Sequence, residues 1–433
     1  MGKASIAIVK VTDVYQALQE SLKLSDGLAG LKVNDRILIK PNIVSWDFKL
    51  PFPPFGVVTT SIVISALVRI LVEHGFRDLT IGEGAVTNGK SEADAVYEAL
   101  GYKTLQERYG VKLVDFNEDE FVLTDYGDGF KLNIAKKALE ADKIINVPVL
   151  KTHNIAKVSL GIKNLKGCIN KKSKQFCHGL GDEELSQTFP RIIEKLPVAL
   201  TIIDGLYTLE KGPGPTGKAY RKDLLIASRD PLACDLVGAT LLGYSAEEVE
   251  HLTNYAQRHG SSVDLTDYEV KGERLADHQE QVVYDWEWTE EDTGPAGFKK
   301  SGITGLAIRK YDSSLCTGCS AHYNPMLILF SSAFKGKPFP NVELVSGKKQ
   351  LASADFDNTV LFGKCACHLN KDNPAIKKSI PIWGCPPDME KFVEVLAEEG
   401  IECDYKEYVR FRHYLFNRYK EAEGFRLADW TVE

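Results

Sequence analysis

The stretch KIINVPVLKTH, residues 143–153, gives the clearest indication of how this chain folds. Its first seven residues are mostly apolar and β-branched, which is typical of a strand buried on both faces of a sheet. Polar side chains follow at Lys151 and His153. Strands of this kind belong to parallel sheets that helices cover on both sides. The stretch therefore predicts an α/β fold with polar groups at one end of a central strand.

The same pattern continues on both sides of this stretch. Short apolar runs alternate with segments of helical periodicity over roughly the first 275 residues, as in a sheet whose strands are joined by helices. We expect strands at residues 5–11, 36–40, 78–82, 111–116, 143–149, 199–204 and 222–228. We expect helices after Thr59 and Thr60 and over residues 91–100, 182–195 and 231–242. The predicted fold class is α/β, with a parallel sheet covered by helices.

A second α/β unit is predicted beyond a polar segment. With 433 residues the chain is longer than one hydrophobic core usually organises. The acidic run WEWTEEDTGPAG lies within residues 276–302, which we interpret as a linker or insertion between an α/β domain at 1–275 and a C-terminal α/β module at 303–433. In the module, Asn324 and Pro325 would cap a helix over MLILFSSAF. Short buried strands are expected at NVELV, NTVLF and SIPIW, and helices at residues 388–399 and in the tail after Tyr405.

Composition narrows the class of protein. The formal net charge is −7 at pH 7, whereas a protein that relies on phosphate contacts normally has a basic domain, so we expect no nucleic-acid partner. No window has the ~20 uninterrupted apolar residues of a membrane span, and the N-terminal MGKASIAIVKV lacks the features of a secretory signal. We therefore expect a cytoplasmic protein without a membrane partner, whose nine cysteines are mostly reduced thiols.

Cysteines gather in the last third of the chain, where six of the nine lie after residue 315. Five of them form short motifs of the kind that bind metal centres: Cys316 and Cys319 in CTGC, Cys365 and Cys367 in CAC, and Cys385 in GCPP. The set predicts a [4Fe-4S] cluster, which suits a reducing, anaerobic setting. Cys365 is preferred to Cys367 as the fourth ligand because Gly363 gives a tight turn after the predicted strand. A structural zinc site and buried cysteines without a metal are the alternatives.

Polar side chains collect where the predicted strands of the first domain end. Ligands of open α/β sheets bind beyond the carboxyl ends of the strands. The residues at these ends are Lys40, Asn42, Glu83, Lys151, His153 and Asp204. They predict one crevice in which Glu83, His153 and Asp204 supply an acid or base. A role as a cap or turn residue is the alternative for each of them.

A lysine-rich segment leads on from the strand end at residue 153. It contains Lys163 and Lys166 in GIKNLKGC, followed by Lys171, Lys172 and Lys174. Such a segment suits a small anionic ligand, a carboxylate or a phosphate, and a solvated lysine-rich surface is the alternative. The run GPGPTGK at 212–218 has the spacing of a phosphate loop, but Ala219 stands where Ser or Thr is required. We interpret that run as a turn or a lid.

Several of these runs resemble known families. ILIKPNIV, TIGEGA, IINVPVLKTH with GIKNLKGC, LTIIDGL with GPGPTG, and LIASRDPLACDLVGATLLG occur in this order over residues 36–243. Together they resemble the domain-of-unknown-function family numbered 362, some members of which carry ferredoxin-like or other cysteine motifs. GCPP resembles the cluster-binding motif of the hydrogenase small subunit and of the related complex I subunit. That resemblance implies that Cys385 is a ligand of a four-iron cluster.

A further resemblance concerns His153 and Lys163. They are similar to the histidine and the cofactor-bearing lysine of nickel-pincer lactate racemases, which implies a general base at His153 and a covalent or electrostatic anchor at Lys163. The other histidine of that family is missing, because the equivalent strand end here is Gly82-Glu83-Gly84. Glu83 would then supply a base.

The sequence supports three functional hypotheses. The leading one is a redox protein whose cluster passes electrons to a small anionic substrate or cofactor. Lys40, Asn42, Lys151 and Lys166 would bind this anion, His153 and Lys163 would be catalytic and help to bind or protonate it, and Glu83 or Asp204 would be the partner acid. The second is a non-redox isomerase or lyase that uses His153 and Lys163. The third is an electron carrier or cluster accessory protein that meets a redox partner protein and has no substrate of its own.

Overall fold

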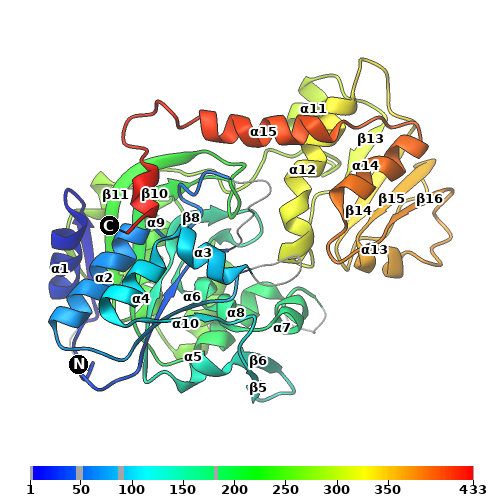
Figure 1. The fold of residues 1–433 in the computed structure, drawn as a ribbon. Coiled ribbons are helices and arrows are strands. Elements are labelled where there is room, and N and C mark those ends of the chain that lie inside the picture. The colour runs from blue at the N-terminus through cyan, green and yellow to red at the C-terminus, as the bar shows by residue number, and fades with distance from the viewer. Residues whose placement is uncertain (1–2, 45–51, 86–91, 180–183, 433) are drawn as a thin grey trace.

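The computed structural model describes residues 3–44, 52–85, 92–179 and 184–432. Two sheets organise these residues, a ten-stranded sheet and a four-stranded sheet, and a two-stranded hairpin lies apart from both. Figure 1 shows the larger sheet with its helices on one side and the smaller sheet, with α12 and α14, on the other. The sequence thus folds into a large α/β domain and a smaller α/β module.

The larger sheet has the strand order β12-β1-β11-β10-β7-β2-β3-β4, and β8 and β9 are attached through β10. Its strands are β1 (Ser5–Lys10), β2 (Ile37–Pro41), β3 (Leu79–Glu83), β4 (Lys112–Asp115), β7 (Lys143–Val147), β8 (Val149–His153), β9 (Lys157–Val158), β10 (Val198–Leu209), β11 (Ala219–Ser228) and β12 (Glu269–Gly272). The separate hairpin consists of β5 (Phe121–Asp125) and β6 (Lys131–Ala135). Every strand expected in the first domain is present in the larger sheet, which confirms the α/β class.

The larger sheet is mostly parallel, not wholly parallel as predicted. β2 pairs in parallel with β3 and β7, and β7 pairs in parallel with β10. β11, however, runs antiparallel to both β10 and β1. The reason is that residues 210–218 join β10 directly to β11, and so short a connection cannot make the crossover that parallel neighbours need.

Helices cover both faces of the larger sheet and enclose two hydrophobic cores. Side chains alternate along β2, so that Ile37 and Ile39 enter one core and Leu38 enters the other. The first core is covered by α1 (Val14–Leu24), α2 (Ser61–Glu73), α3 (Ala93–Ala99) and α4 (Tyr102–Tyr109). The second is covered by α5 (Lys136–Glu140), α6 (Gly161–Asn164), α8 (Leu185–Ile193), α9 (Pro231–Leu241) and α10 (Glu250–His259). The strand ends are therefore held between two packed layers.

The module has a four-stranded parallel sheet in the order β13-β14-β15-β16. Its strands are β13 (Leu306–Ile308), β14 (Val342–Ser346), β15 (Asn358–Phe362) and β16 (Ser379–Ile382). Its helices are α11 (Ala296–Lys300), α12 (Thr317–Ala333), α13 (Lys364–Leu369), α14 (Met389–Glu398) and α15 (Tyr405–Asn417). The three strands and the helix over 388–399 expected from the sequence are all present.

One expected helix start was wrong. α12 begins at Thr317, with Cys316 in the N-cap position, and Pro325 lies inside the helix instead of capping it. A proline in a helix removes one backbone hydrogen bond and is normally costly. Here Tyr323, two residues before Pro325, and Met326, directly after it, are buried in the module core, so packing holds the helix together. The CTGC motif therefore opens a long helix.

The last residues of the chain return to the first domain. Figure 1 shows α15 leading from the module toward the first domain, and the segment after it turning back onto that domain beside β10. The Phe55 ring centroid lies 5.0 Å from that of Phe425 and 5.2 Å from that of Trp430, and Trp430 Nε1 donates to the Val58 carbonyl at 3.1 Å. The end of the chain thus packs on the first domain, in keeping with the expectation that the tail packs back on the body of the protein.

Candidate functional site

Lys40 and Glu83 form a buried ion pair at the ends of β2 and β3. Lys40 Nζ lies 2.8 Å from Glu83 Oε2, and the two side chains are 0% and 4% exposed. The same amine donates to the Pro41 carbonyl at 2.9 Å, and Glu83 accepts the N–H groups of Ile43 and Gly84 at 3.2 and 2.8 Å. A buried pair is tolerated when each charge has its partner and further hydrogen bonds. This pair meets that condition.

Asn42, Asn164 and Lys151 extend this network to β8. Asn42 Nδ2 donates to Asn164 Oδ1 at 2.8 Å. Lys151 Nζ donates to Asn42 Oδ1 at 2.7 Å and to the Val57 carbonyl at 2.6 Å, and burial lowers the pKa of Lys151 to about 7. Lys40, Asn42 and Lys151, which the sequence assigned to ligand binding, thus lie together. Their polar atoms are bonded mainly to one another and to the backbone.

Asp204 holds the start of α2. Its Oδ2 accepts the N–H and the hydroxyl of Thr60, the N-cap residue of α2, at 2.7 and 2.8 Å. Its Oδ1 accepts the Leu206 N–H at 3.1 Å, and burial raises the pKa of the carboxyl group. Capping a helix in this way stabilises its first turn. The interactions of Asp204 are therefore those of a structural cap.

His153 and Lys163 lie at the other side of β8, beside α6. His153 is 7% exposed, and its Nδ1 accepts the N–H groups of Ile155 and Ala156 at 3.1 and 3.2 Å. A neutral ring with Nδ1 as acceptor carries its proton on Nε2. Lys163 Nζ donates to Ser159 Oγ at 3.2 Å. His153 is thus oriented by the backbone, and the Lys163 amine keeps donor capacity.

Lys166 and His178 complete this group. His178 Nδ1 lies 2.8 Å from the Ser313 carbonyl, to which it donates, so a neutral ring accepts at Nε2, and that atom contacts Lys166 Nζ. The amines of Lys163 and Lys166 lie 5.9 and 6.0 Å from the centroid of the same ring, Phe189. We call His153, Lys163, Lys166 and His178 the basic cluster.

The basic cluster brings four buried or half-buried basic side chains together. Burial is the main cause that lowers the pKa of all four groups, to about 8 for Lys166, and repulsion from neighbouring cations contributes to each. In the described ranges, the hydrogen-bond and ring partners of Lys163 and Lys166 are Ser159, His178 and Phe189, none of which is a carboxylate. Buried cations without a counter-charge are costly. The cluster is therefore suited to an anionic ligand.

Four thiols gather at one end of the module. Cys316 caps α12 and Cys319 lies in its first turn, Cys365 lies in the first turn of α13, and Cys385 lies between β16 and α14. The pKa of Cys319 is raised by the hydrogen bond between its thiol and that of Cys316, then by burial and by the charges of the other thiols, Cys365 and Cys385 included. We call these four residues the four-thiol site.

The fifth candidate, Cys367, points elsewhere. It is buried, and its Sγ donates to the Leu361 carbonyl at 3.4 Å. Gly363 has a positive φ of 91°, and a Cβ at this position would lie 3.1 Å from Cys319 Sγ. Glycine is therefore needed here for its backbone conformation and for the close approach of the thiol.

The donor set of the four-thiol site suits a cluster. Iron-sulfur clusters are held by cysteine thiolates, four of them for a four-iron cluster. The Cys316 sulfur accepts the thiol hydrogen of Cys319 and the backbone N–H groups of Gly318 and Cys319, which, with the Lys348 cation, lower its pKa. In the parts of the chain that the structure describes, no three His, Cys, Asp or Glu side chains form a group that could hold a single metal ion. The match between this site and an iron-sulfur cluster therefore rests on the presence of four cysteine thiols, and not on a geometry that would hold a single metal ion.

The four-thiol site faces the lysine-rich segment of the first domain. A cavity of about 60 Å³ lies between them. It is lined by Ala85, Asn117, Lys171, Lys174 and Gln175 and by Cys316, Thr317, Gly318, Cys319, Cys385 and Pro386. Lys348 Nζ donates to the carbonyls of His178 and Ser314 at 2.7 and 2.8 Å, which joins the module to the basic cluster. The two sites expected from the sequence are therefore neighbours.

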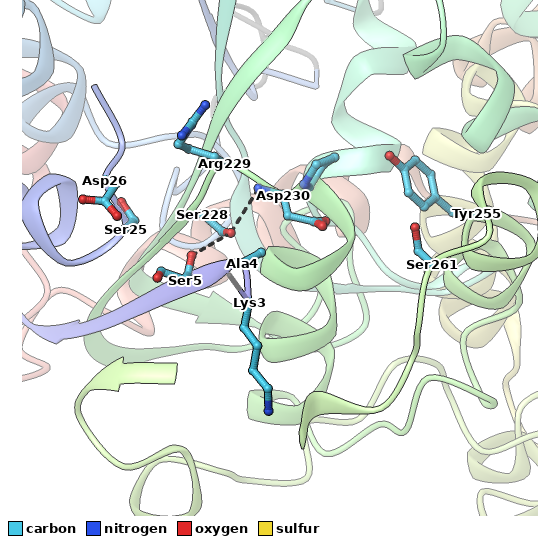
Figure 2. Close-up of a pocket in the computed structure, with 11 residues that line it drawn as sticks. Lys3, Ala4, Ser5, Ser25, Asp26, Ser228, Arg229, Asp230, Tyr255 and Ser261 are labelled. Atoms are coloured by element: carbon cyan, nitrogen blue, oxygen red, sulfur yellow. Dashed lines mark hydrogen bonds between the residues drawn. The ribbon is translucent and has the colours of Figure 1, made fainter. Parts of the chain in front are cut away.

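A larger cavity of about 410 Å³ lies at the opposite end of the strands of the larger sheet, where β1 begins and β11 ends. Figure 2 shows Ser5, Ser228 and Asp230 on its wall. Ser228 Oγ donates to the Ser5 carbonyl at 3.0 Å and accepts the Asp230 N–H at 3.1 Å, while Asp230 caps α9. These polar groups are occupied with one another and with the helix cap.

Comparison with known proteins bears out the resemblance to the domain-of-unknown-function family numbered 362. Residues 37–240 match the model of the family described as Domain of unknown function (DUF362). The chain is 29% identical over 216 residues to Thylakoid-associated protein sll1697 of Synechocystis sp., a match that covers 49% of this chain and 64% of that protein. The chain thus spans less than two thirds of that relative. None of the helices in the described ranges is long and apolar enough to cross a membrane.

A solved structure also resembles this chain. It is the lactate racemase apoprotein from Thermoanaerobacterium thermosaccharolyticum, with a TM-score of 0.37 and 10% identity. The match covers 96% of this chain and 91% of that chain. At this level of likeness we transfer no residue role from it.

Sequence reasoning missed three residues of the site: Gln175, His178 and Lys348. Gln175 and His178 follow the lysine-rich segment, and Lys348 follows β14. None of them belongs to a motif, and each acquires its contact only when the module packs on the first domain. No local signal in the sequence points to them.

Proposed function

We propose that this chain, whose residues 37–240 carry the DUF362 domain, is a redox protein that holds a [4Fe-4S] cluster at the four-thiol site and passes electrons to a small anion bound at the basic cluster. The observation that supports this most is the position of the two sites. Lys348 contacts the His178 backbone and also lowers the pKa of Cys316, so one side chain lies between them. An anion at the basic cluster would therefore be near the thiolates.

Each group of residues has a role in this proposal. When bound, the cluster would supply electrons, which it receives from a redox partner protein. Lys163 and Lys166 neutralise the anion and donate to its oxygens. His153, whose proton lies on Nε2, is the candidate proton donor. The Lys40–Glu83 pair and Lys151 hold the strand ends that carry these groups.

Metal analysis tests the first half of the proposal. Protein purified without oxygen should contain about four irons and four acid-labile sulfides per chain and should bleach with dithionite. Cys365→Ser should lose most of the iron, whereas Cys367→Ser, whose thiol bonds to Leu361 instead, should keep it. One zinc per chain without colour, or equal iron in the two variants, would contradict the proposed site.

Anion binding tests the second half. Malonate and inorganic phosphate are suitable probes for calorimetric titration, because a carboxylate or a phosphate is the expected class of ligand. Lys163→Met and Lys166→Met should each weaken binding of these probes at least tenfold. Lys172→Met is the matched control, since Lys172 belongs to the same lysine-rich segment but is exposed. If Lys163→Met and Lys166→Met both bind malonate and phosphate as tightly as the wild type does, the basic cluster is not an anion site.

A lysine-based isomerase or lyase is the second candidate function. Burial lowers the pKa of Lys163 well below its usual value, which increases the share of neutral amine that can attack a carbonyl carbon. Incubation with pyruvate and borohydride should then leave a reduced adduct on Lys163, detectable by mass spectrometry. The Lys163→Met variant should show no adduct. A protein that forms no adduct, yet contains the cluster, would favour the redox function.

A further inference from the structure

α7 (Lys171–Phe176) brings a first-domain side chain to the four-thiol site. Gln175 Nε2 donates a hydrogen bond to Cys385 Sγ at 3.2 Å. Gln175 lies in the wall of the cavity between the two sites, as does its neighbour Lys174, whose Nζ donates to the Gly84 carbonyl at 2.6 Å. The amide of Gln175 is thus held at the sulfur from outside the module.

A hydrogen bond from the Gln175 amide stabilises negative charge on the Cys385 sulfur. Hydrogen bonds to the sulfurs of an iron-sulfur cluster belong to the factors that set its reduction potential. Reduction adds negative charge, and a charge-assisted hydrogen bond strengthens as the charge on its acceptor grows. The donor therefore stabilises the reduced state more than the oxidised state, which raises the potential.

The position of α7 links this bond to the basic cluster. His178 follows α7 by two residues, contacts Lys166, and donates to the Ser313 carbonyl of the module. Asn170 caps the other end of α7 and accepts the Ser173 N–H at 2.8 Å. α7 is therefore anchored between Cys385 on one side and Lys166 on the other.

We propose that Gln175 is a positioning residue that raises the reduction potential of the cluster and links the redox state of the cluster to α7. This inference rests on the proposed function, because it requires a cluster at the four-thiol site. A bond that strengthens on reduction holds α7, and with it His178, more firmly beside Lys166. By linkage, an anion that stabilises α7 at the basic cluster also favours the reduced cluster.

Potentiometric titration of the full chain, followed by electron paramagnetic resonance, tests the inference. Gln175→Leu removes the donor at similar size and should make reduction about tenfold less favourable, a downward shift of about 59 mV for a one-electron couple. Gln175→Asn keeps the amide on a shorter side chain and should shift the potential in the same direction. Gln106→Leu, an exposed glutamine on α4, is the control and should match the wild type.

The outcomes separate this inference from the proposed function. Wild-type protein with four irons, and a Gln175→Leu potential equal to that of the wild type, would overturn the role of Gln175 and leave the cluster in place. Wild-type protein without iron would remove both. If Gln175→Leu fails to assemble a cluster, Gln175→Asn decides: a lowered potential supports the inference and an unchanged one overturns it.

Discussion

Replacing Glu83 by glutamine would leave Lys40 without its counter-charge in the interior. The Lys40 side chain is 0% exposed, and Glu83 Oε2 lies 2.8 Å from its amine. Breaking a buried pair in this way costs about 3–5 kcal/mol. The variant can instead fold with a neutral amine, at a cost of about 4.6 kcal/mol at pH 7, because removing the proton from a lysine in the unfolded chain requires about 1.36 kcal/mol per pH unit. We therefore expect Glu83→Gln to lose about 3–4.6 kcal/mol of unfolding free energy at pH 7.

The pH dependence identifies the cause of this loss. At pH 9.5 removing the proton from a lysine in the unfolded chain costs only about 1.2 kcal/mol. The loss of unfolding free energy in Glu83→Gln should therefore shrink as the pH rises. Urea unfolding followed by circular dichroism at pH 7 and 9.5 measures both values. Lys40→Met with Glu83→Gln should recover much of the loss, because no charge is then left unpaired. A loss that is negligible at pH 7, or that is equal at both pH values, would refute this reasoning.

Three further predictions concern the module, the basic cluster and the tail. Gly363→Ala should lower the iron content, because its Cβ would lie 3.1 Å from Cys319 Sγ, whereas Gly400→Ala, which has a similar positive φ but nothing within 4 Å, should not. Malonate affinity, measured by calorimetry, should fall as the pH rises through about 8, because Lys166, whose pKa is lowered to about 8, loses its proton there. Trp430→Ala should cost about 3–5 kcal/mol of unfolding free energy because Trp430 is buried, whereas Trp383→Ala, at 49% exposure, should stay within about 0.5 kcal/mol.

The strands could be predicted because their signal is local. β2 and β7 are buried on nearly all positions, so their sequences are continuous apolar runs that need no knowledge of their neighbours. The direction of β11 could not be predicted in the same way. Its sequence fits either orientation, and only the length of the connection from β10, which the sequence does show, decides it. The direction of β11 is therefore encoded in the length of a connection and not in the sequence of the strand itself.

The residues of the candidate site also differ in whether a local sequence motif identifies them. CTGC and GCPP are local motifs, so Cys316, Cys319 and Cys385 could be named from the sequence. The choice between Cys365 and Cys367 depends on which way each side chain points from α13, and one of them turns back to the Leu361 carbonyl. That contact is set by packing against β15. Residue type and spacing do not contain it.

Lys40 and Lys163 of the first domain differ in how many hydrogen-bond acceptors surround the side-chain amine. Lys40 Nζ has three acceptors, the Pro41 carbonyl, Glu83 and Asn164, which use all three donors of an ammonium group. In the described ranges, the Lys163 amine has one hydrogen-bond acceptor, Ser159 Oγ.

Lys40 is fully buried and Lys163 is half-buried, and only Lys163 has donors without an acceptor in the described ranges, which carries a cost. An anion would satisfy those donors and neutralise the charge at once. The sequence alone does not distinguish Lys40 from Lys163. The acceptors that folding brings to Lys40 satisfy all of its donors, whereas those of Lys163 are left available for the proposed anion.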